Sequence, residues 1–366
     1  MNAWPMLPRR RLLLIGAALA ASRGARGAAP APVVLPRDFG AHPQAHIEWW
    51  YLTGALDLPG QAEPHGFQIT FFRLRNDAVA EDHPSAFAAH QILFAHAALT
   101  DPAAGRLRHD QRIARAGFGI AEAAQGDTDL RLRGWTLRRE AGAEGGHRYR
   151  TQVQARDFGW ELHLAATQPV LLQGEAGWSR KAPDPAYASH YLSEPQLAAS
   201  GRLWLGQGQA LDVTGRAWLD HEWSDALLAP GAVGWDWVGM NLADGGALTA
   251  FRLRRADGSA LWAGGSLRSA DGRLRSFGAD EVRFTPLRWW QSPATQARYP
   301  VQWRLETPAG THELRARLDA QELDSRASTG TVYWEGLSDL FDAQGRRVGR
   351  GYLELTGYAS PLRLGW

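Results

Sequence analysis

Apolar and polar residues alternate with a period of two along most of the chain, and this feature most restricts its fold. The alternating segments are bounded by Gly, Pro and Asp and recur roughly every ten residues, whereas helical periodicity is scarce. Representative segments are 65–75, 130–139, 149–155, 160–166, 211–218, 247–255, 301–307 and 351–357. Asp257-Gly258 and Asp271-Gly272 have the composition of hairpin turns. The pattern predicts an all-β protein.

The 366 residues exceed a typical single domain, and the sequence repeats itself. Four landmarks recur in the same order: 70–75 as 249–254, 105–108 as 272–275, 148–149 with 161–162 as 298–299 with 313–314, and 215–220 as 349–354. We predict a duplicated domain, covering residues 30–225 and 232–366, with the boundary between Ser224 and Trp235. An antiparallel barrel of about eight strands fits either half and can enclose one small ligand.

The first 29 residues predict an export signal. Arg9, Arg10 and Arg11 precede an apolar run from Leu12 to Ala21, and small residues continue to Ala29. The paired arginines resemble a twin-arginine signal, with an ordinary secretory signal as the alternative. We expect cleavage before Val33 and a periplasmic or secreted protein. No later run approaches the roughly 20 apolar residues of a transmembrane segment.

Composition restricts the partners and the source of stability. The chain contains no cysteine, so packing must replace disulfides. Its formal charge of +2 comes from scattered basic residues without a basic block, which disfavours a nucleic-acid partner. Lys181 is the only lysine, and codon usage explains this more simply than phosphate recognition.

Three aromatic and ionisable clusters are candidates for a functional site. The first is His46-Ile47-Glu48-Trp49-Trp50-Tyr51, the second is Trp218-Leu219-Asp220-His221-Glu222-Trp223, and the third is Trp235-Asp236-Trp237. On strands, His46, Glu48 and Trp50 share one face, whereas Asp220 and Glu222 share a face that excludes His221. We expect His46, Glu48 and Trp50 to project into a space close to the domain junction, and Tyr51 is a further ligand-binding candidate.

These motifs, with the segment from Gly215 to Trp223, resemble the carotenoid 1,2-hydratase and AttH-like family, which includes proteins described as secreted hydrolases. The resemblance implies two tandem lipocalin-like antiparallel β-barrels. It also implies that Asp220 occupies the place of the hydratases' proton donor. Trp218 stands where the hydratases have Tyr, which weakens the implied hydratase activity.

A physical argument for Asp220 is independent of the resemblance. Protonation of an alkene requires an acid shielded from water, and burial among Trp218, Trp223 and Trp235 raises a carboxyl pKa. Glu222 or His221 would then activate water. The structural alternative is that Asp220 and Glu222 pair with arginine at the domain junction while the tryptophans fill barrel ends.

Other sites have less support. His46, Glu48 and residues 220–222 lack a metal-binding spacing, so we expect no metal and no cofactor. No Gly-x-Ser-x-Gly motif indicates a serine hydrolase. His96, His190 and Tyr191 are additional candidates for lining a cavity.

Three functions remain open at this point. The protein either carries a hydrophobic small molecule such as a carotenoid, terpenoid or lipid, or transforms one by acid catalysis at a pocket near the domain junction. A third alternative is an accessory component of an ABC-type membrane transporter, which would need an exposed apolar rim for its partner.

Overall fold

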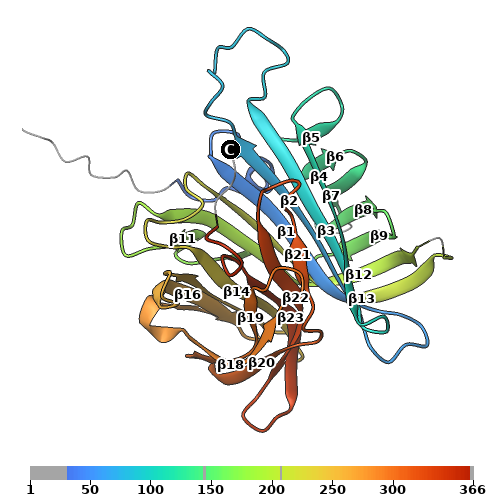
Figure 1. The fold of residues 1–366 in the computed structure, drawn as a ribbon, viewed down its shortest axis with the longest axis vertical. Coiled ribbons are helices and arrows are strands. Elements are labelled where there is room, and N and C mark those ends of the chain that lie inside the picture. The colour runs from blue at the N-terminus through green and yellow to red at the C-terminus, as the bar shows by residue number, and fades with distance from the viewer. Residues whose placement is uncertain (1–30, 143–145, 207, 363–366) are drawn as a thin grey trace, which may run out of the picture. The chain divides into compact units, whose positions relative to one another are not determined.

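The protein folds almost entirely into antiparallel β-strands, as the alternation predicted (Figure 1). The structure is a computed structural model that describes residues 31–142, 146–206 and 208–362. The described residues from Pro32 onward belong to one compact unit. The helical elements described are the short 3-10 turns η1 (Arg37–Phe39) and η3 (Ala279–Glu281). The predicted signal, residues 1–29, lies outside the described residues.

The first sheet has 13 strands in the order β4-β3-β2-β1-β13-β12-β9-β8-β7-β6-β5, with β10 and β11 paired to β12. Its strands are β1 (Ile47–Asp57), β2 (His65–Arg75), β3 (Gln91–Asp101), β4 (Arg106–Arg115), β5 (Ala121–Ala123), β6 (Asp129–Leu132), β7 (Trp135–Ala141), β8 (His147–Gln154), β9 (Phe158–Ala165), β10 (Leu171–Leu172), β11 (Trp178–Arg180), β12 (Ala188–Leu205) and β13 (Leu211–Ser224). The ends of the sheet approach each other, since Arg133 Nε donates a hydrogen bond of 3.1 Å to the carbonyl of Ile113 in β4. The sheet is a nearly closed barrel.

The second sheet has 10 strands in the order β17-β16-β15-β14-β23-β22-β20-β19-β18, with β21 paired to β22. Its strands are β14 (Gly234–Leu242), β15 (Ala247–Arg254), β16 (Ala260–Arg268), β17 (Leu274–Phe277), β18 (Arg283–Gln291), β19 (Arg298–Thr307), β20 (Gly310–Ala316), β21 (Glu322–Asp324), β22 (Val332–Phe341) and β23 (Arg347–Leu355). The chain leaves the first sheet at Ser224 and enters the second at Gly234. The division into two domains, residues 30–225 and 232–366, stays a prediction.

The two sheets repeat one strand pattern, because β1 lies between β2 and β13 as β14 lies between β15 and β23. The registers identify equivalent trios: Trp49, Phe72 and Glu222 in the first sheet and Trp237, Phe251 and Glu354 in the second. The sequence landmark 215–220/349–354 paired Asp220 with Glu354 instead. The sequence alignment of this landmark is therefore offset by two residues from the structural register. A shift of two residues leaves every side chain on the same face of its strand, so the alternation of apolar and polar residues cannot reveal it.

The predicted turns are present, with one refinement. Gly258 and Gly272 have φ values of 84° and 86°, in the left-handed region that glycine adopts without strain, and they connect β15 to β16 and β16 to β17. The segment predicted as one strand at 130–139 is a hairpin, in which β6 and β7 are joined at Arg133-Gly134. Both turn residues have positive φ, as a two-residue hairpin turn requires.

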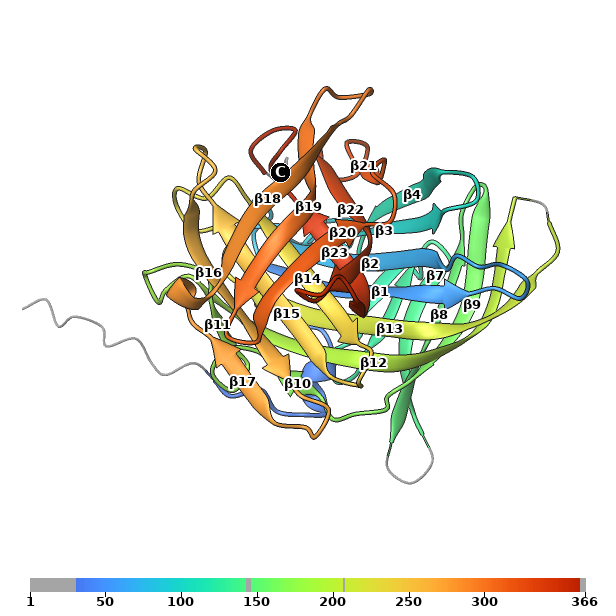
Figure 2. The same cartoon turned by 90° about the horizontal axis from the view of Figure 1, so that it is seen from below.

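The period-two alternation separates three apolar cores. One face of the first sheet buries Trp50, Trp135 and Trp160 within its barrel, and the second sheet buries Trp303 and Trp334. A third core lies between the sheets and contains Tyr51, Trp218, Trp237, Ala247, Phe251, Leu253, Leu337 and Tyr352. Because this core combines side chains from both sheets, the outward faces of β1 and β13 pack against β14, β22 and β23. Figure 2 shows the strands of both sheets from below.

Candidate functional site

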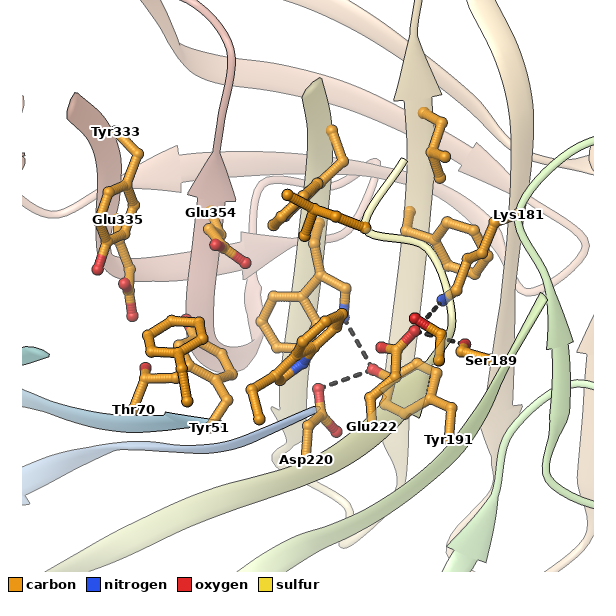
Figure 3. A pocket seen from close by; sticks show the side chains of 18 of the residues that line it. Tyr51, Thr70, Lys181, Ser189, Tyr191, Asp220, Glu222, Tyr333, Glu335 and Glu354 are labelled. Carbon is orange, nitrogen blue, oxygen red and sulfur yellow. Dashed lines mark hydrogen bonds and ion pairs between the residues drawn. The ribbon is translucent and has the colours of Figure 1, made fainter. Parts of the chain in front are cut away.

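A pocket lies between the two sheets, next to this third core (Figure 3). Its cavity volume is about 90 Å³, and it opens to solvent. Aromatic, hydroxyl and carboxyl side chains line it: Trp49, Tyr51, Thr70, Phe72, Lys181, Ser189, Tyr191, Asp220, Glu222, Ser224, Ala226, Leu227, Trp235, Trp237, Phe251, Leu253, Tyr333, Glu335 and Glu354. Its mostly apolar lining with a few polar groups suits a small molecule that has an apolar part.

Strand periodicity explains why both sheets contribute acids to this space. Asp220 and Glu222 are two residues apart on β13, so both leave the strand on the face opposite the barrel core. Glu335 on β22 and Glu354 on β23 are direct cross-strand neighbours in the other sheet. Four carboxyl groups thus line one pocket from two opposing walls.

Asp220 is 3% exposed and accepts three hydrogen bonds. Ser193 Oγ and Trp218 Nε1 donate to Oδ1 at 2.5 and 2.6 Å, and Tyr191 Oη donates to Oδ2 at 2.7 Å. Burial raises the pKa of Asp220 to about 7 despite these donors, and the charge of Glu222 raises it further. The carboxyl group can therefore hold or release a proton near neutral pH.

Tyr191 extends the hydrogen bonding from Asp220 to the second sheet. Its hydroxyl accepts a hydrogen bond of 3.0 Å from Trp237 Nε1 while donating to Asp220. Burial raises the pKa of Tyr191 well above its usual value, and Asp220 and Glu222 add to this effect. The phenol stays protonated and fixes the orientation of the Asp220 carboxyl group.

Glu222 has a different environment from Asp220. Lys181 Nζ lies 2.7 Å from Glu222 Oε1, and Ser189 Oγ donates to the same oxygen at 2.5 Å. The Lys181 ammonium also lies 4.4 Å from the ring centre of Phe251 and 4.9 Å from that of Tyr191. This acid is therefore held as an ion pair beneath aromatic rings.

Glu335 and Glu354 form the acidic part of the opposite wall. Burial raises the pKa of Glu335 well above its usual value, and Glu354 raises it further. Burial also raises the pKa of Glu354 to about 7, with contributions from Asp220 and Glu222. Like charges this close disfavour simultaneous ionisation, so the pair retains a proton at neutral pH.

The structure places the His46, Glu48 and Trp50 face elsewhere than expected. Trp50 lies in the core of the first barrel, and half-buried His46 pairs with Asp77 at 3.1 Å. Glu48 is fully buried among other polar groups, and none of the three lines the pocket. The opposite face of β1 supplies Trp49 and Tyr51, because both faces carry large aromatics and alternation alone does not say which one points outward.

Glu48 is the centre of a separate buried network. Arg73 Nε lies 2.7 Å from Oε2, while His42 Nδ1 and His221 Nε2 lie 2.7 and 2.9 Å from Oε1. Burial opposes ionisation of Glu48, but hydrogen bonds from His221 and His42 and the charge of Arg73 lower its pKa below the usual range. The network explains why an acid tolerates complete burial.

This network is also the place where the described residues offer metal ligands. One nitrogen each of His42 and His221 and one oxygen of Glu48 lie within 4.8 Å of one another. Arg73 already supplies a cation to the same carboxylate. Both Glu48 oxygens are thus already engaged by Arg73, His42 and His221, whereas His221 Nδ1 has no hydrogen-bond partner among the described residues.

The remaining candidates from the sequence divide between the pocket and its surroundings. Tyr191, Trp235 and Trp237 line the pocket, and Trp218 contacts it through Asp220. His221 points away from it, as the alternation on β13 predicted, and Trp223 stacks between the rings of His42 and His190 at 3.8 and 4.9 Å. His190 thus belongs to this stack and does not line the pocket.

Asp236 and His96 are buried beside the pocket without lining it. Asp236 pairs with Arg252 at 2.6 Å and accepts a hydrogen bond from Tyr358 at 2.8 Å. His96 Nδ1 lies 2.9 Å from Tyr333 Oη and its Nε2 lies 2.9 Å from Ser328 Oγ, and burial lowers its pKa to about 3. Both connect structural elements around the pocket wall.

Lys181, Glu335 and Glu354 were not predicted as site residues. Two of them carried a signal: Lys181 is unique in the chain, and Glu354 belongs to the landmark matched with Asp220. Glu335 has no such mark in the sequence. Its position follows from the pairing of β22 with β23 and from the packing of two sheets.

The fold and the pocket define a two-sheet, lipocalin-like protein with a carboxyl-rich aromatic pocket between the sheets. The sequence model described as AttH-like matches residues 26–358, and the chain belongs to the AttH-like family. A crystal structure of a putative AttH from Nitrosomonas europaea is 48% identical, with a TM-score of 0.81 over 90% of this chain and 98% of that one. Comparison with curated proteins found no significant match.

Two more distant structures share the fold. Kievitone hydratase from Nectria haematococca is 14% identical, with a TM-score of 0.67 over 90% of this chain and 94% of that one. CghA crystallised with Sch210972 is also 14% identical, with a TM-score of 0.53 over 86% of this chain and 89% of that one.

No helix among the described residues has the length and apolarity to span a membrane.

Proposed function

We propose that the protein binds an apolar small molecule between its two sheets and transforms it by acid catalysis, with Asp220 as the proton donor. The buried Asp220, whose pKa of about 7 allows it to hold a proton at neutral pH, carries this proposal. Trp49, Phe72, Trp235 and Phe251 supply apolar surface beside it. Hydration of a carbon–carbon double bond is the reaction that best suits these groups. Asp220 transfers its proton to one carbon of the double bond, water adds to the resulting cation, and the proton that the added water loses returns to the Asp220 carboxylate.

Asp220 fits the role of proton donor better than Glu222 and His221, the other two catalytic candidates on β13. Glu222 is engaged by Lys181 and Ser189, and His221 points into the Glu48 network. Asp220 contacts only neutral donors, which fix its direction without supplying a cation. The relatedness in fold to kievitone hydratase and CghA supports a pocket that acts on a small molecule.

The experiment begins with the protein purified from its native host and mass spectrometry of co-purified lipids and terpenoids. Each identified compound is incubated in water labelled with ¹⁸O, with wild type and with Asp220→Asn. Hydration incorporates the label, and Asp220→Asn should lower the rate by roughly 10² or more while leaving ligand affinity much less affected. Asp101→Asn, which changes a buried aspartate outside the pocket, is the matched control.

Three outcomes distinguish catalysis by Asp220, catalysis without Asp220, and ligand binding without catalysis. Loss of turnover in folded Asp220→Asn supports the proposal, and full turnover in that variant refutes it. Binding without any change in the mass of the compound, in wild type and variant alike, identifies a carrier of a hydrophobic ligand.

We also propose that the protein is exported, on the basis of residues 1–29. N-terminal sequencing of periplasmic protein should find a start before Val33 and after the apolar run. An intact Met1 on periplasmic protein would contradict this.

A further inference from the structure

Equivalent glutamates on the two walls of the pocket differ in whether they have a partner cation. Glu222 and Glu354 hold the same register position in the two sheets, opposite Trp49 and Trp237 respectively. Glu222 has the Lys181 ammonium beside it at 2.7 Å. In the described parts of the chain, no lysine or arginine forms an ion pair with Glu354 or with its neighbour Glu335. Figure 3 shows Lys181 beside Glu222 and the two glutamates across the pocket.

Lys181 shows how this pocket accommodates an ammonium group. Its nitrogen contacts one carboxylate oxygen and lies over the rings of Phe251 and Tyr191 at 4.4 and 4.9 Å. Carboxylate and aromatic faces together stabilise a partly desolvated cation. The pocket therefore combines the two groups that recognise an organic cation.

The opposite wall has the same groups without a cation. Glu335 is 2% exposed, and neither its Oε1 nor the buried hydroxyl of Tyr51 has a hydrogen bond of regular geometry to another described residue. The Tyr51 and Tyr333 hydroxyls face this carboxyl group and partly offset the rise in its pKa that burial causes. The indoles of Trp49 and Trp235 stack at 6.5 Å in the same pocket. A buried carboxyl group that lines a pocket among aromatic rings and has no partner cation among the described residues indicates a place for a cationic ligand group.

We infer that the pocket binds a small molecule with an apolar body and a positively charged ammonium head, and that the head lies against Glu335 and Glu354. This inference rests on the proposed ligand-binding pocket but not on the role of Asp220. The two carboxyl groups of Glu335 and Glu354, which have no partner cation among the described residues, make this wall of the pocket more favourable for a cation than for a neutral or anionic head. Lys181 does not oppose this, because Glu222 neutralises it.

Cation binding should displace a proton from Glu335 and Glu354. Both have raised pKa values, so an ammonium ion substitutes for the proton that they share. The charged or titratable groups that face them come from several elements: Tyr51, Lys181, Asp220, Glu222, Tyr333 and Tyr352. The tyrosines stay neutral because burial raises their pKa values, so the carboxyl groups set the pH dependence.

The test compares two soluble probes below their micellar range, decyltrimethylammonium and the uncharged decyldimethylamine N-oxide. Binding is followed by the fluorescence of the pocket tryptophans and by calorimetry. At pH 8 the wild type should prefer the ammonium probe by roughly tenfold or more. Its affinity for that probe should rise with pH, by up to about tenfold per unit between pH 5 and pH 7.

Variants locate the effect. Glu335→Gln and Glu354→Gln should each remove most of the preference, whereas Glu194→Gln, a buried glutamate outside the pocket, should retain it. If a variant fails to fold, calorimetry of wild type in two buffers with different ionisation enthalpies still reports the released proton. Equal affinity for the two probes, or no proton release by wild type, would overturn the inference.

The outcomes are separable from those for Asp220. Asp220→Asn should keep the preference for the ammonium probe, so loss of turnover with retained cation binding supports both proposals. If Asp220→Asn loses turnover but wild type shows no preference for the ammonium probe, acid catalysis by Asp220 is supported and cation binding at Glu335 and Glu354 is refuted.

Discussion

Replacement of Asp220 by Asn should change how the stability of the protein depends on pH. The native state holds the Asp220 proton up to about pH 7, whereas the unfolded chain releases it near the ordinary value of 3.8. Between these two values the native state binds more protons than the unfolded state, so this group makes the wild type less stable as pH rises, and the effect levels off above pH 7. The difference between 3.8 and about 7 corresponds to about 4 kcal/mol at most.

Asp220→Asn keeps the size of the side chain and removes the ionisable proton. The amide disturbs the hydrogen bonds from Ser193, Trp218 and Tyr191 by an amount that does not change with pH. The free energy of unfolding of the variant minus that of wild type should therefore increase by up to about 4 kcal/mol between pH 4 and pH 8, because the wild type alone loses stability over this range.

Urea unfolding followed by tryptophan fluorescence at pH 4, 5, 6, 7 and 8 measures this change. The matched control is Asp77→Asn, which alters an exposed aspartate whose pKa is lowered mainly by a hydrogen bond from Arg75. Its small effect should have the opposite sign. Parallel stability profiles for wild type and Asp220→Asn would refute the assignment of a raised pKa to this carboxyl group.

Two further substitutions test the packing that positions the pocket. Arg73→Met leaves Glu48 buried without its cation and should lower the free energy of unfolding by roughly 3–5 kcal/mol. Arg75→Met removes an exposed ion pair and should lower it by no more than about 1 kcal/mol. Equal effects of the two substitutions in urea unfolding would contradict the buried network. Gly239→Ala adds a Cβ that meets the indoles of Trp237 and Trp218 and should destabilise by roughly 1–3 kcal/mol, so an unchanged melting temperature would show that the sheets do not approach as described.

The sequence predicted the class of fold because alternation and turn residues are local properties. The strand at 65–75 and the Gly turns at 258 and 272 are confirmed for this reason. The face of β1 that lines the pocket was predicted wrongly. Glu48 is polar yet points inward, because Arg73, His42 and His221 from distant segments stabilise it there.

The candidate site could be predicted only in part. Asp220 and Glu222 share one strand, so their common face follows from a period of two. Glu335 joins them only through the register of β22 with β23 and the packing of the second sheet on the first. Lys181 comes from the connection between β11 and β12, whose path no local pattern determines.

A crystal structure of the protein purified with its bound compound locates the ligand directly. We expect electron density for that compound between the sheets, in contact with Asp220 on one wall and with Glu335 or Glu354 on the other. Density only in the interior of the first barrel, around Trp50 and Trp160, would show that the ligand does not bind between the sheets.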